Sequence, residues 1–116
     1  MGIPDYRLPS EVLDNEIKYL LRHGIELKTG ARFGSDLSLT NLRDENYAAI
    51  FLGIGAHGSI PMQIQGEDQA AEVIDAIGFL RAVNLGSRTP PGKQVIVIGG
   101  GNVAIDAARV AKRLGA

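Results

Sequence analysis

Residues 94–116 place the strongest constraint on how this chain folds. An apolar stretch, Gln94–Ile98, leads through Gly99-Gly100-Gly101-Asn102-Val103-Ala104 into a segment with helical periodicity. The β-branched residues of the stretch predict a strand, and the glycines predict a tight turn. A strand, a Gly-x-Gly-x-x-Ala turn and a helix are typical of the first unit of a Rossmann-like parallel sheet.

Each small residue of this turn has a physical purpose in nucleotide binding. The first glycine turns the chain off the strand, the second lets a pyrophosphate approach the backbone, and the third position packs helix against strand. The phosphates then lie at the positive end of the helix. We therefore predict a dinucleotide site at Gly99, Gly100, Gly101, Asn102, Val103 and Ala104. A turn with a purely structural purpose is the alternative, and Asn102 is also expected to cap the helix.

The pattern along the whole chain alternates between helix and strand. Helices are expected from Ser10, as N-cap, to Gly24, and at 39–45 and 75–85, with strands at Ile25–Thr29, Tyr47–Ile54 and Gln94–Ile98. A last helix is expected after the glycine turn, with Lys112 and Arg113 near its C-terminus. This order predicts an α/β fold with a parallel sheet. The last strand would have two unpaired edges, which we expect to be covered by a three-stranded sheet made from these segments, or by strand swapping in a homodimer.

Composition excludes several classes of function. A formal net charge of −1 provides no basic field for nucleic acid, and the longest apolar run, at 48–56, is far shorter than a membrane span of about 20 residues. The absence of cysteine excludes thiolate metal sites and cysteine-ligated iron–sulfur clusters within the chain. A cytoplasmic protein is the expectation.

No side chain is predicted to act as a catalytic acid, base or nucleophile, and no metal site is predicted. His23 and His57 have no partner at a metal-ligand spacing. Asp106 and Arg109, three residues apart on a helix, predict an ordinary surface ion pair. A second glycine element, Gly53-Ile54-Gly55, is compatible with either a close-packed strand end or a cofactor contact.

Three segments resemble one family. Gly2-Ile3-Pro4-Asp5-Tyr6-Arg7-Leu8-Pro9, Tyr47–Ala56 and Gly99–Ala116 are similar, in this order, to motifs of the glutamate synthase small (β) subunit family, which includes the corresponding half of dihydropyrimidine dehydrogenase. The resemblance implies a flavoprotein oxidoreductase with FAD in one Rossmann-like domain and NADPH in a second. It further implies electron transfer through iron–sulfur clusters outside this chain to a large catalytic subunit or another acceptor.

The resemblance also implies roles for particular residues. Arg7 would contact the FAD phosphates or ribose, Phe33 would lie beside the adenine, and Gly55 would let the backbone approach the flavin. Gly100, Gly101, Asn102 and Val103 would hold the NADPH pyrophosphate. The first FAD fingerprint and the arginines for the NADP 2′-phosphate have no counterpart in residues 1–116. We therefore expect an internal fragment, with 1–72 from the FAD domain and 73–116 beginning the NAD(P)H domain.

Two other hypotheses stay open at the level of sequence. The chain could be a stand-alone nucleotide-binding or interaction module without redox activity, which predicts tight nucleotide binding by this chain alone. It could also be a structural αβ piece with vestigial motifs, which predicts no response to nucleotides. Under the fragment hypothesis, the isolated chain is expected to be inactive, and the choice between NADP and NAD depends on residues beyond 116.

Overall fold

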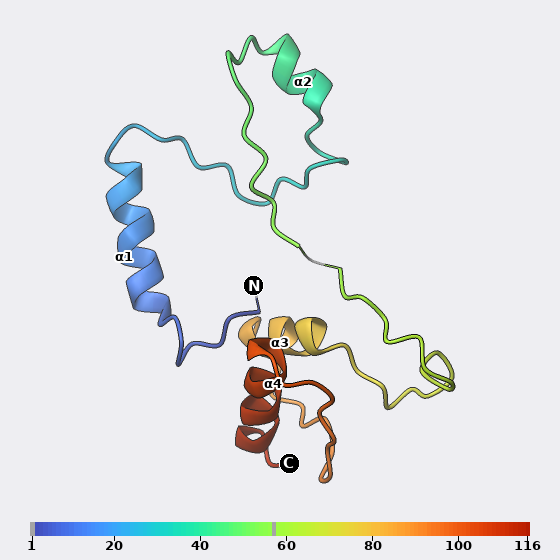
Figure 1. Cartoon of the computed structure of the whole chain (residues 1–116). Coiled ribbons are helices and arrows are strands. Elements are labelled where there is room, and N and C mark those ends of the chain that lie inside the picture. The colour runs from blue at the N-terminus through green and yellow to red at the C-terminus, as the bar shows by residue number, and fades with distance from the viewer. Residues whose placement is uncertain (1, 57) are drawn as a thin grey trace. The chain divides into compact units, whose positions relative to one another are not determined.

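The computed structural model describes residues 2–56 and 58–116, so the prediction made for His57 lies outside the described residues. Within these residues the chain forms four helices (Figure 1): α1 (Ser10–Leu21), α2 (Leu39–Asp44), α3 (Ala76–Asn84) and α4 (Asn102–Arg113). All four fall where the sequence predicts helices. For α1, α2 and α3 the predicted and observed ends agree within two or three residues, which is the ordinary variation of helix ends.

The start of α1 differs from the prediction in one detail. Ser10 is the first helical residue rather than the N-cap, and its backbone N–H and its hydroxyl both donate to Oδ1 of Asp5, at 2.9 and 3.0 Å. Asp5 therefore satisfies a donor that a capping side chain would otherwise satisfy. The helix ends before Gly24, which takes a φ of +80°, as expected of a glycine just after a helix.

Side-chain caps explain where α2 and α3 begin. Ser38 and Asn41 form a reciprocal capping box at the start of α2. At α3, the carboxylate of Asp75 accepts hydrogen bonds from the N–H groups of Ile77 and Gly78, and it also accepts from the Ser59 hydroxyl. These hydrogen bonds lower the pKa of Asp75, with the Ser59 contact as the largest cause.

The chain divides into two compact units. One comprises Met1–Asp14 with His57–Ala116, and the other comprises Asn15–Ala56. The division groups residues that pack against one another within each unit. The predicted boundary between residues 72 and 73 concerns nucleotide domains and stays a prediction.

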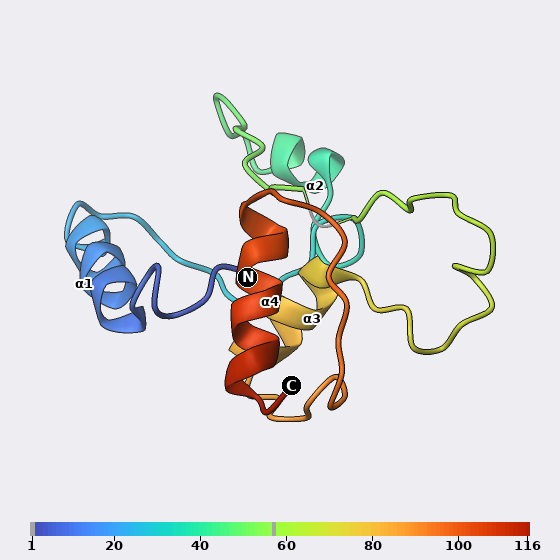
Figure 2. The same cartoon turned by 60° about the horizontal axis from the view of Figure 1, so that its bottom comes forward.

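The core of the first unit lies where α3 meets α4, and both views show these helices side by side (Figures 1 and 2). α3 contributes Leu80, and α4 contributes Ala107, Val110 and Ala111. The alanines on α4 let the helices approach closely, since they add little volume at the contact. By contrast, α1 buries no residue, and its apolar stripe stays partly exposed.

The predicted strands do not form within the described residues. Segments 25–29, 47–54 and 94–98 have no ladder partners there, and the sole bridge is an isolated parallel pair between Phe33 and Leu37. A strand exists only where a second strand accepts and donates its backbone hydrogen bonds. The apolar side chains that would cover a sheet are correspondingly exposed, with Phe51 at 95% and Ile96 at 90%. The expected three-stranded sheet is therefore not observed, and strand swapping is not supported.

Candidate functional site

The glycine turn leads into α4 as the sequence predicts, but residues 94–98 before it form no strand. Gly99 takes a φ of +125°, a conformation that L-residues with a side chain rarely adopt. A Cβ on Gly99 would lie 3.3 Å from the Cβ of Ala104, so the turn and the first turn of the helix are in close contact. Gly100 and Gly101 face open space, because a Cβ on either would meet no atom within 4 Å.

The N-terminus of α4 has no side-chain cap. The N-cap is Gly101, which has no side chain to accept the first N–H groups of the helix. Asn102 is therefore the first residue of the helix and not its cap, which corrects the prediction. Exposed N–H groups at the positive end of a twelve-residue helix can bind an anion such as a phosphate.

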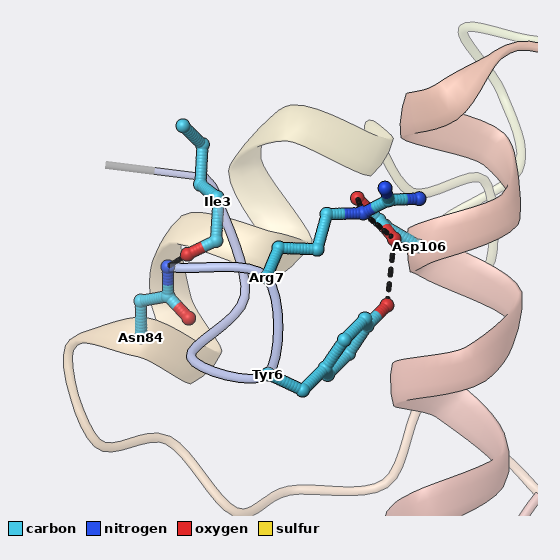
Figure 3. A network of polar contacts seen from close by, with 5 residues as sticks. All are labelled: Ile3, Tyr6, Arg7, Asn84 and Asp106. Atoms are coloured by element: carbon cyan, nitrogen blue, oxygen red, sulfur yellow. Dashed lines mark hydrogen bonds and ion pairs between the residues drawn. The ribbon is translucent and has the colours of Figure 1, made fainter. Parts of the chain in front are cut away.

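A polar cluster joins the N-terminal segment to α4 (Figure 3). The Tyr6 hydroxyl donates to Oδ1 of Asp106 at 2.6 Å, and Nε of Arg7 donates to both carboxylate oxygens at 2.7 Å. The residue Asp106 is buried, with 6% of its surface exposed, while the Arg7 side chain is 40% exposed. At the start of the same segment, Nδ2 of Asn84 donates to the Ile3 carbonyl at 2.6 Å, which holds the segment to the end of α3.

Two further guanidinium groups surround Tyr6. Arg109 and Arg113 lie 4.4 and 4.0 Å from the centre of its ring, within the range of cation–π contacts. The expected ion pair between Asp106 and Arg109 is therefore wrong, because Asp106 pairs with Arg7 and Arg109 stacks on the tyrosine. The cluster contains three guanidinium groups and one carboxylate, which makes its surroundings positive.

The cluster shifts the titration of its members. The hydrogen bond from Tyr6, followed by that from Arg7, holds the pKa of Asp106 below its ordinary value of 3.8. Burial, together with the hydrogen bond to Asp106, raises the pKa of Tyr6 above 10.0. Asp106 is thus ionised and Tyr6 neutral at physiological pH, which are the states that the hydrogen bond between them requires.

The glycine turn and the cluster share one hollow of about 340 Å³. Arg7 and Asp106 line it together with Asn102 and Val103, the first two residues of α4. The structure therefore brings Arg7, which the resemblance assigns to FAD, to the side of the turn predicted to bind the second nucleotide.

The other two residues predicted to contact FAD lie in the second unit. Phe33 is exposed and makes the isolated bridge to Leu37, and Gly55 has a φ of +73°. The positive φ of Gly55 favours a glycine over residues with a side chain. Their contacts with FAD remain a prediction.

Sequence reasoning missed Tyr6 and Asp106 as members of this site. A signal was present for Asp106, because this acidic residue lies in the apolar stripe of α4 next to Ala107, Val110 and Ala111. A carboxylate in such a stripe is stable only with a partner. That the partners come from residues about one hundred positions earlier could not be seen in the sequence.

Residues 2–56 and 58–116 contain neither a metal-binding cluster nor a membrane-spanning helix. No group of three or more histidine, cysteine, aspartate or glutamate side chains is placed to hold a metal ion. No helix among these residues is long and apolar enough to cross a bilayer. His23 instead makes an edge-on ring contact with Tyr19, at 5.0 Å between centroids.

Comparison with known protein families assigns the chain to one of them. The sequence model of the pyridine nucleotide-disulphide oxidoreductases matches residues 4–116, so the chain belongs to this family. Members of the family have a Rossmann-like α/β fold and bind FAD and NAD(P)H.

Curated relatives agree with this assignment. The chain is 42% identical to the NADPH-Fe(3+) oxidoreductase subunit beta of Geobacter sulfurreducens over 118 residues, which cover 100% of the chain and 17% of that protein. It is 42% identical to the NADP(+)-dependent formate dehydrogenase subunit beta of Moorella thermoacetica over 119 residues, which cover 100% of the chain and 16% of that protein. It is 36% identical to the glutamate synthase [NADPH] small chain of Escherichia coli over 126 residues, which cover 99% of the chain and 26% of that protein.

These matches confirm the resemblance to the glutamate synthase small-subunit family. The chain spans about a sixth of the length of the first two relatives. No solved structure matches the chain.

Proposed function

We propose that this chain supplies nucleotide-binding elements of a flavin-dependent oxidoreductase similar to the glutamate synthase small subunit. In this proposal NADPH, held at the turn before α4, gives a hydride to FAD, and the electrons pass on to a partner subunit or another acceptor. The observation that carries it is the uncapped glycine turn, in which Gly99 has a positive φ and Gly101 faces open space. Family membership supports the flavin half of the reaction.

In this proposal the residues of the chain bind and orient the cofactors, and none of them takes part in the hydride transfer itself. When bound, the flavin and the nicotinamide would carry the hydride and electron transfer. Gly100 and Gly101 leave room for a pyrophosphate, the first N–H groups of α4 donate to it, and Ala104 keeps the helix close to the turn. The relatives named as oxidoreductase subunits do not favour a stand-alone module without redox activity.

The test is anaerobic reduction of the flavin by NADPH, in protein expressed from its complete natural coding sequence. We expect NADPH to bleach the flavin absorbance and the Gly101→Val variant to lose this response while keeping its flavin. The reason is that a side chain at Gly101 enters the open space where the phosphate would lie. Protein that is purified without flavin, or whose flavin NADPH does not reduce, would refute the proposal.

A further inference from the structure

Residues 59–75 form a loop whose two ends are tied together. The Ser59 hydroxyl donates to Oδ1 of Asp75, so residues 60–74 leave and return to one point of the fold. Figure 2 shows this segment as an open ring that begins and ends beside α3. Residues 60–74 are exposed, apart from the half-buried Glu67 and Ala70, so burial of side chains contributes little to holding the ring closed. Polar contacts therefore have to hold it.

The carboxylate of Asp75 serves two elements at once. Its Oδ1 accepts from the Ser59 hydroxyl and from the N–H of Ile77 at 3.2 Å, and its Oδ2 accepts from the N–H of Gly78 at 2.6 Å. The first contact closes the loop, whereas the other two cap α3. A carboxylate that several donors surround is held in one rotamer, so loss of one donor makes the side chain freer to leave the others.

A glycine in the first turn of α3 makes room for this carboxylate. A Cβ on Gly78 would lie 2.7 Å from Oδ2 of Asp75, which is closer than real Cβ contacts come. Glycine inside a helix is about 1 kcal/mol less favourable than alanine. The absence of a side chain at residue 78 therefore has a structural reason, since it lets Asp75 reach the N–H of that residue.

The tip of the loop is held by a second carboxylate. Glu67 accepts from the N–H groups of Met62, Gln63 and Ile64, at 3.1, 2.8 and 3.4 Å. The turn includes Gln63 at a φ of +59°, which is uncommon for a residue with a side chain. The contacts of Glu67 involve no atom of Asp75, so the tip can be disturbed without touching the cap of α3.

The position of α3 gives this link a consequence for the rest of the first unit. α3 contributes Leu80 to the core with α4, and both Ile77 and Leu80 line the hollow at the first turn of α4. Asp75 thus lies between an exposed loop and the wall of that hollow. A change in the loop reaches the first turn of α3 through the same carboxylate that caps it.

We propose that Ser59 and Asp75 form a clasp, in which closure of the loop 59–75 fixes the first turn of α3 and opening of the loop loosens that turn. This conformational device is separate from the proposed function, because it involves no nucleotide and its test measures none. Both residues of the clasp are exposed, so water can replace their hydrogen bond, and the loop can open while the core between α3 and α4 stays folded.

The experiment measures two properties of protein expressed from its complete natural coding sequence. Opening of the loop is followed as the rate at which a glutamate-specific protease cuts after Glu72, identified by mass spectrometry. The start of α3 is followed by hydrogen exchange of the N–H groups of Ile77 and Gly78. Ser59→Ala removes the hydroxyl and leaves the carboxylate in place. We expect it to raise the cleavage rate at least about threefold and the exchange rate about twofold, the range that loss of one hydrogen bond predicts.

Two variants separate the clasp from other effects on the loop. Glu67→Ala is the matched control, because it disturbs the tip alone; cleavage should accelerate, while exchange at Ile77 and Gly78 should stay as in wild type. Asp75→Ser replaces two carboxylate oxygens by one hydroxyl, which can cap α3 but cannot also hold Ser59. It should open the loop as Ser59→Ala does and add nothing to cleavage when the two are combined, since both remove one bond.

Four results would overturn the inference. If Ser59→Ala changes neither rate, the clasp does not hold the loop. If it accelerates cleavage alone, the loop and α3 are independent. If Glu67→Ala raises exchange at Ile77 and Gly78 as much as Ser59→Ala does, any disturbance of the loop reaches α3 and the clasp is not the link. If exchange in the buried stretch 107–111 rises together with that of α3, the whole unit unfolds and no separate opening exists.

Discussion

At the scale of single residues, Asp106 connects the N-terminal segment to α4. It is a buried carboxylate held by a phenol and a guanidinium from a segment far away in sequence. Removing one partner of such a group leaves a buried charge without compensation, so each of the three residues depends on the other two.

The titration of Asp106 makes stability depend on pH in the acid range. Its pKa is lower in the folded chain than the ordinary 3.8, so its contribution is complete above that value and is lost as pH falls through the folded pKa. We expect the melting temperature of wild type to fall more steeply below about pH 4 than that of Asp106→Asn, which lacks this group. Parallel acid profiles measured by circular dichroism would contradict the expectation.

The same cluster predicts an alkaline effect with the opposite sign. The pKa of Tyr6 is raised above 10.0, so its contribution is complete below that value and is lost as pH rises through the folded pKa. We expect the tyrosine absorbance change of wild type to include one step above pH 10 that is missing in Tyr6→Phe. A step of the same size and position in Tyr6→Phe would show that another tyrosine causes it.

Two glycines of one turn should respond differently to alanine. Gly99→Ala places a side chain at a φ of +125° and 3.3 Å from the Ala104 Cβ, so we expect it to lower the free energy of unfolding by about 1–3 kcal/mol. Gly101 has a φ of −78° and open space around it, so Gly101→Ala should cost less than about 1 kcal/mol. Chemical denaturation checks both, and equal losses would show that the turn is not strained at Gly99.

At the scale of elements, packing of α3 on α4 holds the first unit together. Leu80 is 3% exposed at this contact, whereas Leu85, at the C-terminal cap of α3, is 75% exposed. We expect Leu80→Ala to cost about 2–5 kcal/mol, because it removes buried apolar surface and leaves a cavity. Leu85→Ala, the matched control, should change stability by less than about 0.5 kcal/mol. Similar effects of the two changes on urea unfolding would argue against this core.

At the scale of the whole molecule, the polypeptide of residues 1–116 is predicted to be inactive by itself. After α4 it contains no ribose-reading residue, which in dinucleotide-binding units lies about 20 positions beyond the glycine turn. We expect no NADPH oxidation by this polypeptide with added FAD and a dye acceptor. Activity above that of free FAD would contradict the prediction, and tight NADPH binding without it would revive the stand-alone module.

The helices and the nucleotide turn could be predicted from the sequence by itself, and the family motifs pointed to the family. Helix periodicity, capping residues such as Asp75, and glycines at turns act over a few neighbouring positions, so their effect is visible in a short stretch of sequence. The motif at Gly99–Ala104 is local for the same reason. In the structure Gly99 takes a positive φ as the motif predicts, whereas the cap of α4 is Gly101 rather than Asn102 and the strand expected at 94–98 does not form.

Only the tertiary structure decided which distant residues meet. Pairing of Arg7 and Tyr6 with Asp106 spans 99 and 100 positions, and no local pattern encodes such a contact. Strand pairing likewise could not be predicted from local sequence. Residues 25–29, 47–54 and 94–98 have the composition of strands, yet they stay unpaired within the described residues. A helix makes its own hydrogen bonds, whereas a strand or a buried carboxylate depends on a partner brought to it by the fold.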